Sequence, residues 1–260
     1  MKTRIFFLLI IILSALFTEA QRVSNLNFKK DTAFSEGEKL TYQIRFGLLL
    51  AGVTRFSLTD TIYQGKRVFH AMAIGQTTGL ADKLFSVKDI YESWFNKKSI
   101  LPYKQIRNIS EGKYDLYNEV TYNRKNNTIT SKLSGVHHVP AKILDLASSF
   151  YYLRRHDFSK VNEGDTISFN MYFADTIYPF QFRYLGKETV KTKYGKIKCL
   201  KISPIVEVGR MFKKQDDVMI WFTGDKNCLP VVIRMNIRNV GTVHLKLIDF
   251  KNISNQLTIL

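Results

Sequence analysis

The sequence contains little cysteine and little proline. Its 260 residues include only two cysteines, Cys199 and Cys228, and five prolines. Two cysteines cannot build a disulfide framework, so the fold must depend on a hydrophobic core, which a chain of this length can form. The Cys-x-x-Cys and His-Glu-x-x-His spacings of common metal sites are absent. The composition therefore excludes a small disulfide-rich scaffold, and we expect no metal and no other cofactor.

Acidic residues are also scarce. The chain has 22 Asp and Glu against 39 Lys and Arg, a formal net charge of +17. Such an excess favours an acidic partner, which in general means anionic lipid head groups, cell-surface polysaccharide or nucleic acid. The basic residues are dispersed, however, in pairs such as Lys97–Lys98 and Lys213–Lys214. A dispersed pattern is equally typical of an ordinary solvated basic surface.

Long hydrophobic runs are absent after the first twenty residues. Ile5–Phe17 follows two basic residues, but its thirteen residues are short of the roughly twenty that cross a bilayer. Thr18 and Ala20 supply the small residues of a cleavage site. We therefore predict a signal peptide over residues 1–20, cut between Ala20 and Gln21, and no transmembrane segment in the mature chain. Export to the periplasm or cell envelope makes nucleic acid the poorest of the acidic partners, and none is expected.

The predicted export bears on the two cysteines. An oxidising compartment permits a disulfide between Cys199 and Cys228. Two separately buried thiols fit the sequence at least as well, because geometry decides whether a bridge can form and the sequence does not give the distance between them.

Most of the mature chain has the alternating pattern of β-strands. Apolar residues occupy every second position in several segments, which places one face of each strand on a core and the other in water. The clearest segments are 40–46, 114–122, 167–173, 180–184 and 242–247. Turn residues such as Gln64–Lys66 separate the runs. The pattern predicts a mainly β, antiparallel fold in which hairpins close into a barrel, a half-barrel or a sandwich.

One segment has helical rather than strand periodicity. From Pro140 to Asp157 the apolar residues follow a spacing of three and four. Asp145 is placed to cap the start, and Arg154 and His156 fall at the end, where cations are favoured. We predict one mid-chain helix of about three turns here, which crosses over or plugs the sheet. The segment Thr78–Phe85 is predicted to form a second, shorter helical turn.

No repeat and no low-complexity linker divides the chain. We expect residues 1–20 to be the signal peptide, 21–33 an N-terminal lead-in, 34–250 a single β-rich domain and 251–260 a C-terminal tail.

Several short motifs together resemble a known family. They are Gly37–Tyr42, Gly47, Ala51-Gly52, Asp145, Ser149, Tyr151–Arg154, Gly195, Cys199–Ile202, Ile220–Thr223, Asp225, Leu229-Pro230 and Gly241. Between about Phe34 and Phe250 the chain resembles the bacterial family of exported proteins called domain of unknown function 3108. The resemblance implies an envelope β-fold, an open or half barrel that is lipocalin-like or lipoprotein-carrier-like. It brings no established activity and no catalytic residues. Cys228 departs from the pattern, since a polar residue would be more usual in its turn.

No residue constellation in the sequence specifies a reaction. The chain has no Gly-x-Ser-x-Gly elbow and no phosphate-binding glycine loop. The adjacent His137 and His138 would point to opposite faces of a strand, so they are poorly placed to share a metal ion. The pair Asp216–Asp217 is more typical of a solvated turn. We therefore expect no catalytic residues and a protein that is not an enzyme.

The remaining candidates are aromatic and apolar. Nineteen Phe, thirteen Tyr and two Trp fit an ordinary β-rich core, but some could line a ligand cavity. The candidate ligand-binding residues are Phe46, Leu48, Leu50, Trp94 and Trp221. Our leading hypothesis is a barrel that holds an apolar or lipid-like ligand. The alternatives are an envelope module that engages a surface protein, a polysaccharide or another anionic surface, and a hydrolase of envelope glycans or lipids. An empty barrel interior would favour the first hypothesis and a filled interior the second.

Overall fold

The computed structural model of the protein describes residues 32–209 and 211–260. The predicted signal peptide, its cleavage between Ala20 and Gln21, and nearly all of the 21–33 lead-in lie outside the described residues.

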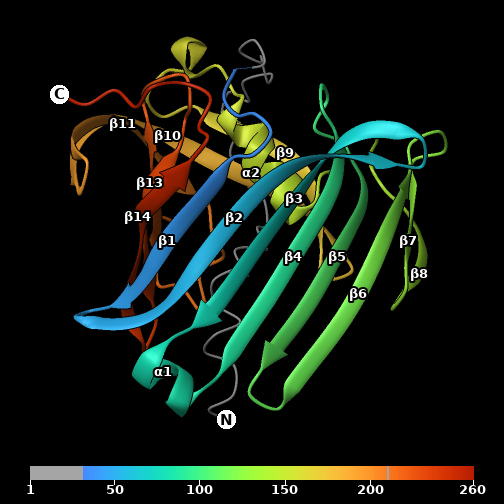
Figure 1. The fold of residues 1–260 in the computed structure, drawn as a ribbon, viewed down its shortest axis with the longest axis horizontal. Helices are drawn as coiled ribbons and strands as arrows, with labels where there is room; N and C mark the ends of the chain where they lie inside the picture. Colours follow the sequence, from blue (N-terminus) through green and yellow to red (C-terminus); the bar gives the residue numbers. More distant parts are fainter. Residues whose placement is uncertain (1–31, 210) are drawn as a thin grey trace.

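Fourteen strands form one antiparallel sheet that does not close (Figure 1). The strands are β1 (Lys39–Phe46), β2 (Leu49–Tyr63), β3 (Lys66–Thr77), β4 (Val87–Asn96), β5 (Pro102–Glu111), β6 (Tyr114–Asn123), β7 (Thr128–Ser131), β8 (Gly135–His138), β9 (Thr166–Phe173), β10 (Thr176–Thr192), β11 (Gly195–Pro204), β12 (Val218–Thr223), β13 (Pro230–Ile237) and β14 (Gly241–Lys251). Their order across the sheet is β8-β7-β6-β5-β4-β3-β2-β1-β14-β13-β12-β11-β10-β9. Thus strands that are adjacent in the sheet are also consecutive in sequence, except for β1 and β14, and β8 and β9 form the two edges. The mainly β, antiparallel, open-barrel prediction is confirmed.

The alternation of apolar residues matches the burial of the strands. In β1 the side chains of Leu40, Tyr42 and Ile44 are buried, while the residues between them are half-buried or exposed. In β4 every second residue from Val87 to Phe95 is buried. A side-chain period of two therefore puts one face of these strands into the core, as the sequence predicts.

Two helices interrupt the strands at the predicted places. α1 (Gly79–Leu84) is the short turn between β3 and β4, and α2 (Leu146–Arg154) is the mid-chain helix. Asp145 caps α2: its carboxylate accepts from the backbone N–H of Ser148, and the Ser148 hydroxyl accepts from the N–H of Asp145. This capping box fixes where the helix begins. The Asp145 carboxylate also accepts a hydrogen bond from Ser93 in β4, which ties the helix to the sheet.

Helix α2 fills part of the space inside the curled sheet (Figure 1). Its Tyr151 ring packs against Phe95 of β4 and against Phe34, with ring centroids 5.6 and 4.8 Å apart. Phe150 stacks on Phe56 of β2 at 4.8 Å. These contacts place the helix in the main hydrophobic cluster, so this part of the barrel interior is filled by the protein's own side chains.

The two edges of the sheet, β8 and β9, are not paired with each other, but short contacts span the opening. The segment before α2 runs along β9, where Leu144 accepts from the N–H of Tyr172. The turn between β9 and β10 carries Asp175, whose carboxylate accepts from Ser131 Oγ of β7 at 2.6 Å and from Asn118 Nδ2 of β6. We call these contacts the seam, because they join the two ends of the sheet.

The two cysteines lie in different hydrophobic clusters. Cys199 on β11 belongs to the second cluster, with β1, β12, β13 and β14, whereas Cys228 belongs to the main one. Both are buried, and no disulfide joins them in the structure.

Candidate functional site

Three of the candidate ligand residues lie at an exposed hairpin rather than inside the barrel. Phe46 ends β1, Leu50 belongs to β2, and Leu48 is in the two-residue turn between them. Gly47 has a φ of +55°, which the first position of such a turn requires and which glycine adopts without strain. The turn therefore holds the Leu48 side chain out in solvent, where it is 93% exposed.

Helix α1 lies beside this hairpin. The backbone N–H of Thr78, just before α1, donates to the carbonyl of Ala51 in β2. Six large apolar side chains are exposed in these two segments, and those other than Leu48 are between 39% and 75% exposed. We call them the apolar end: Phe46, Leu48, Leu49, Leu50, Leu80 and Leu84. Exposed apolar side chains that gather on one part of a protein often mark a surface that binds a partner or a membrane.

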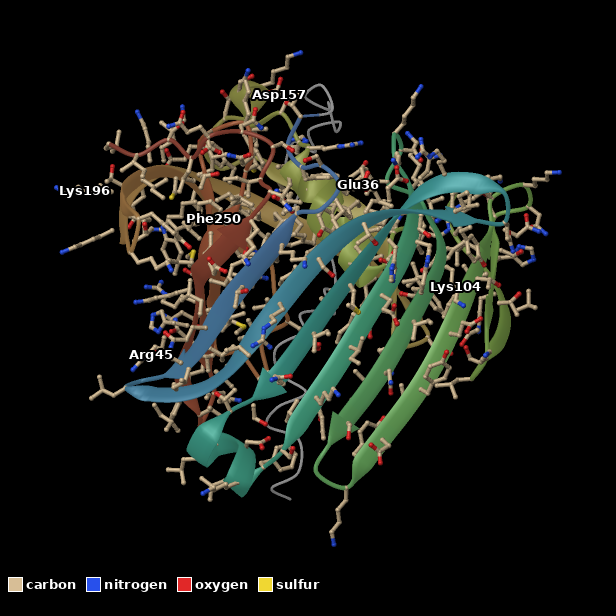
Figure 2. All side chains as sticks on the ribbon, in the orientation of Figure 1. Glu36, Arg45, Lys104, Asp157, Lys196 and Phe250 are labelled. Carbon is tan, nitrogen blue, oxygen red and sulfur yellow. The ribbon has the colours of Figure 1, made fainter. Side chains whose placement is uncertain are left out.

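Three basic residues lie in the same hairpin, in α1 and in an adjoining turn. Arg45 precedes the turn and donates to the carbonyl of Leu48. Lys83 is in α1. Arg238 lies in the turn between β13 and β14, which adjoins the hairpin because Gly241 packs against the Phe46 ring. Figure 2 shows Arg45 at this end of the molecule and Asp157 at the opposite end. The apolar end thus combines exposed leucines with a cationic border.

The two tryptophans lie elsewhere. Trp94 on β4 is half-buried and stacks on His70, with ring centroids 4.2 Å apart. Trp221 on β12 is buried, and its indole N–H donates to Glu188. The strands β4 and β12 are not neighbours in the sheet. The structure therefore brings Phe46, Leu48 and Leu50 together and separates both tryptophans from them.

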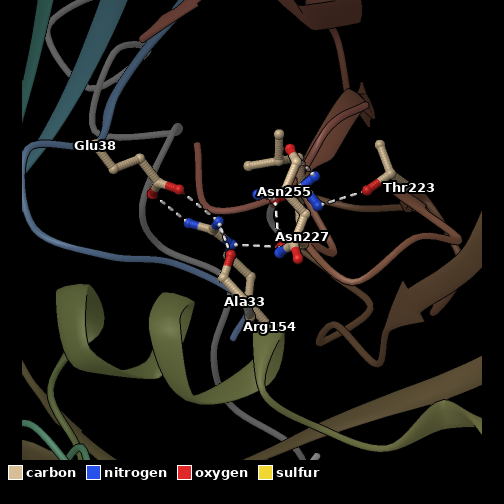
Figure 3. A network of polar contacts seen from close by, with 7 residues as sticks. Ala33, Glu38, Arg154, Thr223, Asn227 and Asn255 are labelled. Carbon is tan, nitrogen blue, oxygen red and sulfur yellow. Dashed lines mark hydrogen bonds and ion pairs between the residues drawn. The ribbon is translucent and has the colours of Figure 1, made fainter. Parts of the chain in front are cut away.

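A buried ion pair anchors the C-terminal end of α2 (Figure 3). Arg154 Nη1 and Nη2 donate to the two carboxylate oxygens of Glu38 at 2.6 and 2.8 Å, and neither side chain is exposed. The same guanidinium donates to the carbonyls of Ala33 and Asn227. Because every polar neighbour of Arg154 is already bonded to it, this network fixes the helix and offers no group to a ligand.

A second buried polar pair was missed by sequence reasoning. The carboxyl groups of Asp89 on β4 and Glu111 on β5 hydrogen-bond to each other. Burial raises the pKa of Asp89 to about 6. Burial first, and then the neighbouring Asp89 carboxylate, raise the pKa of Glu111 to about 7. The sequence contained a signal for this pair. Asp89 stands between Val87 and Tyr91 at one of the alternating positions that a strand buries.

Two pockets formed by the described residues are small. One at the end of α2 has a volume of about 100 Å³, and one between β4–β6 and the seam has about 20 Å³. Sites for drug-sized ligands have roughly 300–1,000 Å³. Residues 32–209 and 211–260 also contain no group of three or more His, Cys, Asp or Glu side chains arranged to hold a metal ion. In the same residues no helix is both long and apolar enough to span a bilayer.

The fold defines a class: an antiparallel open barrel, built from one sheet around one helix. The chain belongs to the family described as protein of unknown function DUF3108, and the match covers residues 41–248. The family resemblance read from the short motifs is thereby confirmed.

Solved structures align with most of the chain. A β-barrel-like protein of domain of unknown function DUF1849 from Brucella abortus aligns with TM-score 0.55 and 8% identity, over 85% of this chain and 99% of that chain. A protein with a YmcC-like fold from Bacteroides fragilis aligns with TM-score 0.39 and 12% identity, over 87% of this chain and 100% of that chain. No curated protein matches the chain. The first likeness supports the barrel-like fold alone.

Proposed function

We propose that this is an exported, non-enzymatic protein of the cell envelope that attaches to an anionic lipid surface through its apolar end. The observation that carries the proposal is the 93% exposed Leu48 at the tip of a hairpin, with five more exposed apolar side chains beside it. Apolar residues that lie at one end of a protein and are bordered by cations are typical of binding at a membrane interface.

The charge supports an anionic surface. Arg45, Lys83 and Arg238 border the leucines, and the whole chain carries +17. A lysine or arginine near an anionic bilayer contributes about 1 kcal/mol of attraction. The leucines would enter the boundary between head groups and acyl chains while the cations stay at the head groups.

Because α2 fills part of the barrel interior, a binding site on the outside of the protein is better supported than an enclosed cavity. Phe150 and Tyr151 of α2 occupy the space in which a lipid-binding barrel would hold its ligand. In this proposal Phe46, Leu48 and Leu50 still contact lipid, as expected from the sequence. The lipid belongs to a membrane surface, however, and does not fill the barrel. A hydrolase is less well supported, because His156, the imidazole in the 100 Å³ pocket, makes no hydrogen bond to a nucleophile.

Vesicle binding tests the proposal. The processed protein, recovered after export with its N-terminus determined by mass spectrometry, is mixed with phosphatidylglycerol or phosphatidylcholine vesicles and sedimented. Leu48→Ser should weaken binding to phosphatidylglycerol roughly thirtyfold, because burying a leucine contributes about 2 kcal/mol. A triple change of Arg45, Lys83 and Arg238 to Gln should abolish the preference for the anionic lipid.

Ile62→Ser is the matched control. Ile62 is 70% exposed, but it lies at the far end of the same strand, β2, next to the turn into β3. This variant should bind vesicles like the unaltered protein. Equal loss in Leu48→Ser and Ile62→Ser, or no vesicle binding at all, would refute attachment through the apolar end.

A further inference from the structure

The 100 Å³ pocket lies beyond the C-terminal end of α2, at the opposite end of the molecule from the apolar end (Figure 2, near Asp157). Its walls come from α2 and the 3₁₀ turn after it (Phe158–Lys160), from β10 and β11, from the turn between β12 and β13, and from Thr32 and Ala33. The lining residues include His156, Phe158, Lys187, Leu200, Asp225 and Lys226.

His156 is the unusual group in this pocket. Its side chain lines the pocket, the residue is only 3% exposed, and neither ring nitrogen has a hydrogen-bond partner. Leaving a buried polar group without a partner is unfavourable, so such a group in a pocket wall indicates that something else bonds to it. Burial lowers the pKa of the ring to about 4. The imidazole is therefore neutral at pH 7 and presents one N–H donor and one free acceptor.

Two ammonium groups border the same pocket. Lys187 on β10 and Lys226 in the turn after β12 both line it, and both are exposed residues. One carboxylate, that of Asp225, also lines the pocket, so the two ammonium groups still leave the pocket with a net positive charge. Asp225 already accepts from Thr223 Oγ1 and from the backbone N–H groups of Asn227 and Thr258.

The helix end does not oppose a negative ligand strongly. The C-terminal end of a helix carries a partial negative charge, which alone would disfavour an anion. The backbone N–H groups of Arg155 and His156 occupy the carbonyl oxygens of the last turn, at Tyr152 and Leu153. Arg154 also lines the pocket, but its charge is paired with the Glu38 carboxylate.

We propose that this pocket binds a small oxyanion, the phosphate or carboxylate group of a free anion or of the end of a longer molecule. The His156 ring N–H donates to an oxygen of the ligand, and Lys187 and Lys226 neutralise its charge. Phe158 packs edge-on against the imidazole, with ring centroids 4.9 Å apart, and holds its orientation. Leu200 forms the wall of the pocket on the β11 side.

The size of the pocket limits the ligand. A single water needs about 10–15 Å³ measured in the same way, so about 100 Å³ admits a group of several heavy atoms and excludes a nucleotide or an acyl chain. A larger molecule can therefore present only its anionic end. The site is independent of the apolar end and of attachment to lipid.

NMR of the histidine ring tests the site directly. Inorganic phosphate, acetate and glycerol 3-phosphate are titrated separately into the purified protein at constant ionic strength set with chloride, and the Cε1–H signal of His156 is followed. We expect a saturable shift with at least one of them, and no shift at His138, which is exposed on β8. Glycerol 3-phosphate binding as tightly as phosphate indicates the end of a longer molecule, whereas binding of phosphate or acetate alone indicates a free anion.

Charge-matched variants decide whether the pocket is responsible. Lys187→Gln with Lys226→Gln should weaken binding about tenfold or more, because each removes a nearby charge. Lys125→Gln with Lys142→Gln removes the same charge from exposed positions outside the pocket and should leave affinity unchanged. The proposal is overturned if none of the three anions gives a saturable shift, or if both double variants bind alike.

Discussion

The buried ion pair between Glu38 and Arg154 allows a sharp test of how α2 is held. Both side chains are completely buried, and Arg154 donates to both carboxylate oxygens. Transfer of each ion from water costs several kcal/mol, which only the partner and the surrounding hydrogen bonds offset. Arg154→Met leaves the Glu38 carboxylate buried without its cation, so we expect a loss of about 3–5 kcal/mol in the free energy of unfolding.

The double variant distinguishes the effect of an unpaired buried charge on stability from the effect of the lost hydrogen bonds. Glu38→Met combined with Arg154→Met also removes the Arg154 donors to the carbonyls of Ala33 and Asn227, but it leaves no charge behind. We therefore expect the double variant to be about 2–3 kcal/mol more stable than Arg154→Met alone. A partly exposed pair, Lys201 with Glu188, provides the control: Lys201→Met should cost less than about 1 kcal/mol.

Equilibrium unfolding in urea, followed by circular dichroism, measures all of these values. The midpoints should shift while the slope against urea stays constant, since the surface exposed on unfolding is unchanged. If the double variant is no more stable than Arg154→Met, an unpaired buried carboxylate is not the cause of the lost stability, and the prediction is refuted.

Burial raises the pKa of Glu111 to about 7, above its usual 4.5, so its stabilising contribution is complete below about pH 4.5 and is lost as the pH rises through 7. Glu111→Gln should flatten that decline in thermal melts across this range, and an unchanged profile would contradict the assignment. Asp175→Asn should loosen the seam, which accelerated hydrogen exchange along β9 would reveal; equal exchange would count against the seam. Asp145→Ala should lower stability in urea by about 1–2 kcal/mol, and a smaller change would mean that the cap is dispensable. The thiols of Cys199 and Cys228 should react with Ellman's reagent only after unfolding, and rapid reaction of the native protein would show that they are not buried.

Local patterns in the sequence were sufficient for the secondary structure. The alternation in Leu40–Phe46 predicts β1 because a strand's side chains point to opposite faces in turn, whatever the strand pairs with. Asp145 predicts the start of α2 because its cap bonds join residues three apart. Each of these signals operates within a few residues, so each can be read before the fold is known.

The same patterns could not show which surfaces remain open. Phe46, Leu48 and Leu50 form an apolar run that fits a cavity wall as well as a hairpin tip, and only the position of the turn at Gly47 decides between them. His156 looks in the sequence like a cation at a helix end. Its burial, and with it the pKa of about 4, comes from the strands that pack around it.

What the sequence by itself determined was the class of the fold, the places of its helices and the family. The tertiary structure alone decided the pairing of β1 with β14, the partner of Arg154, and the separation of Cys199 from Cys228. The physical reason is the distance along the chain. Glu38 and Arg154 meet across more than a hundred residues, and such contacts form only when the whole sheet has closed the intervening loop.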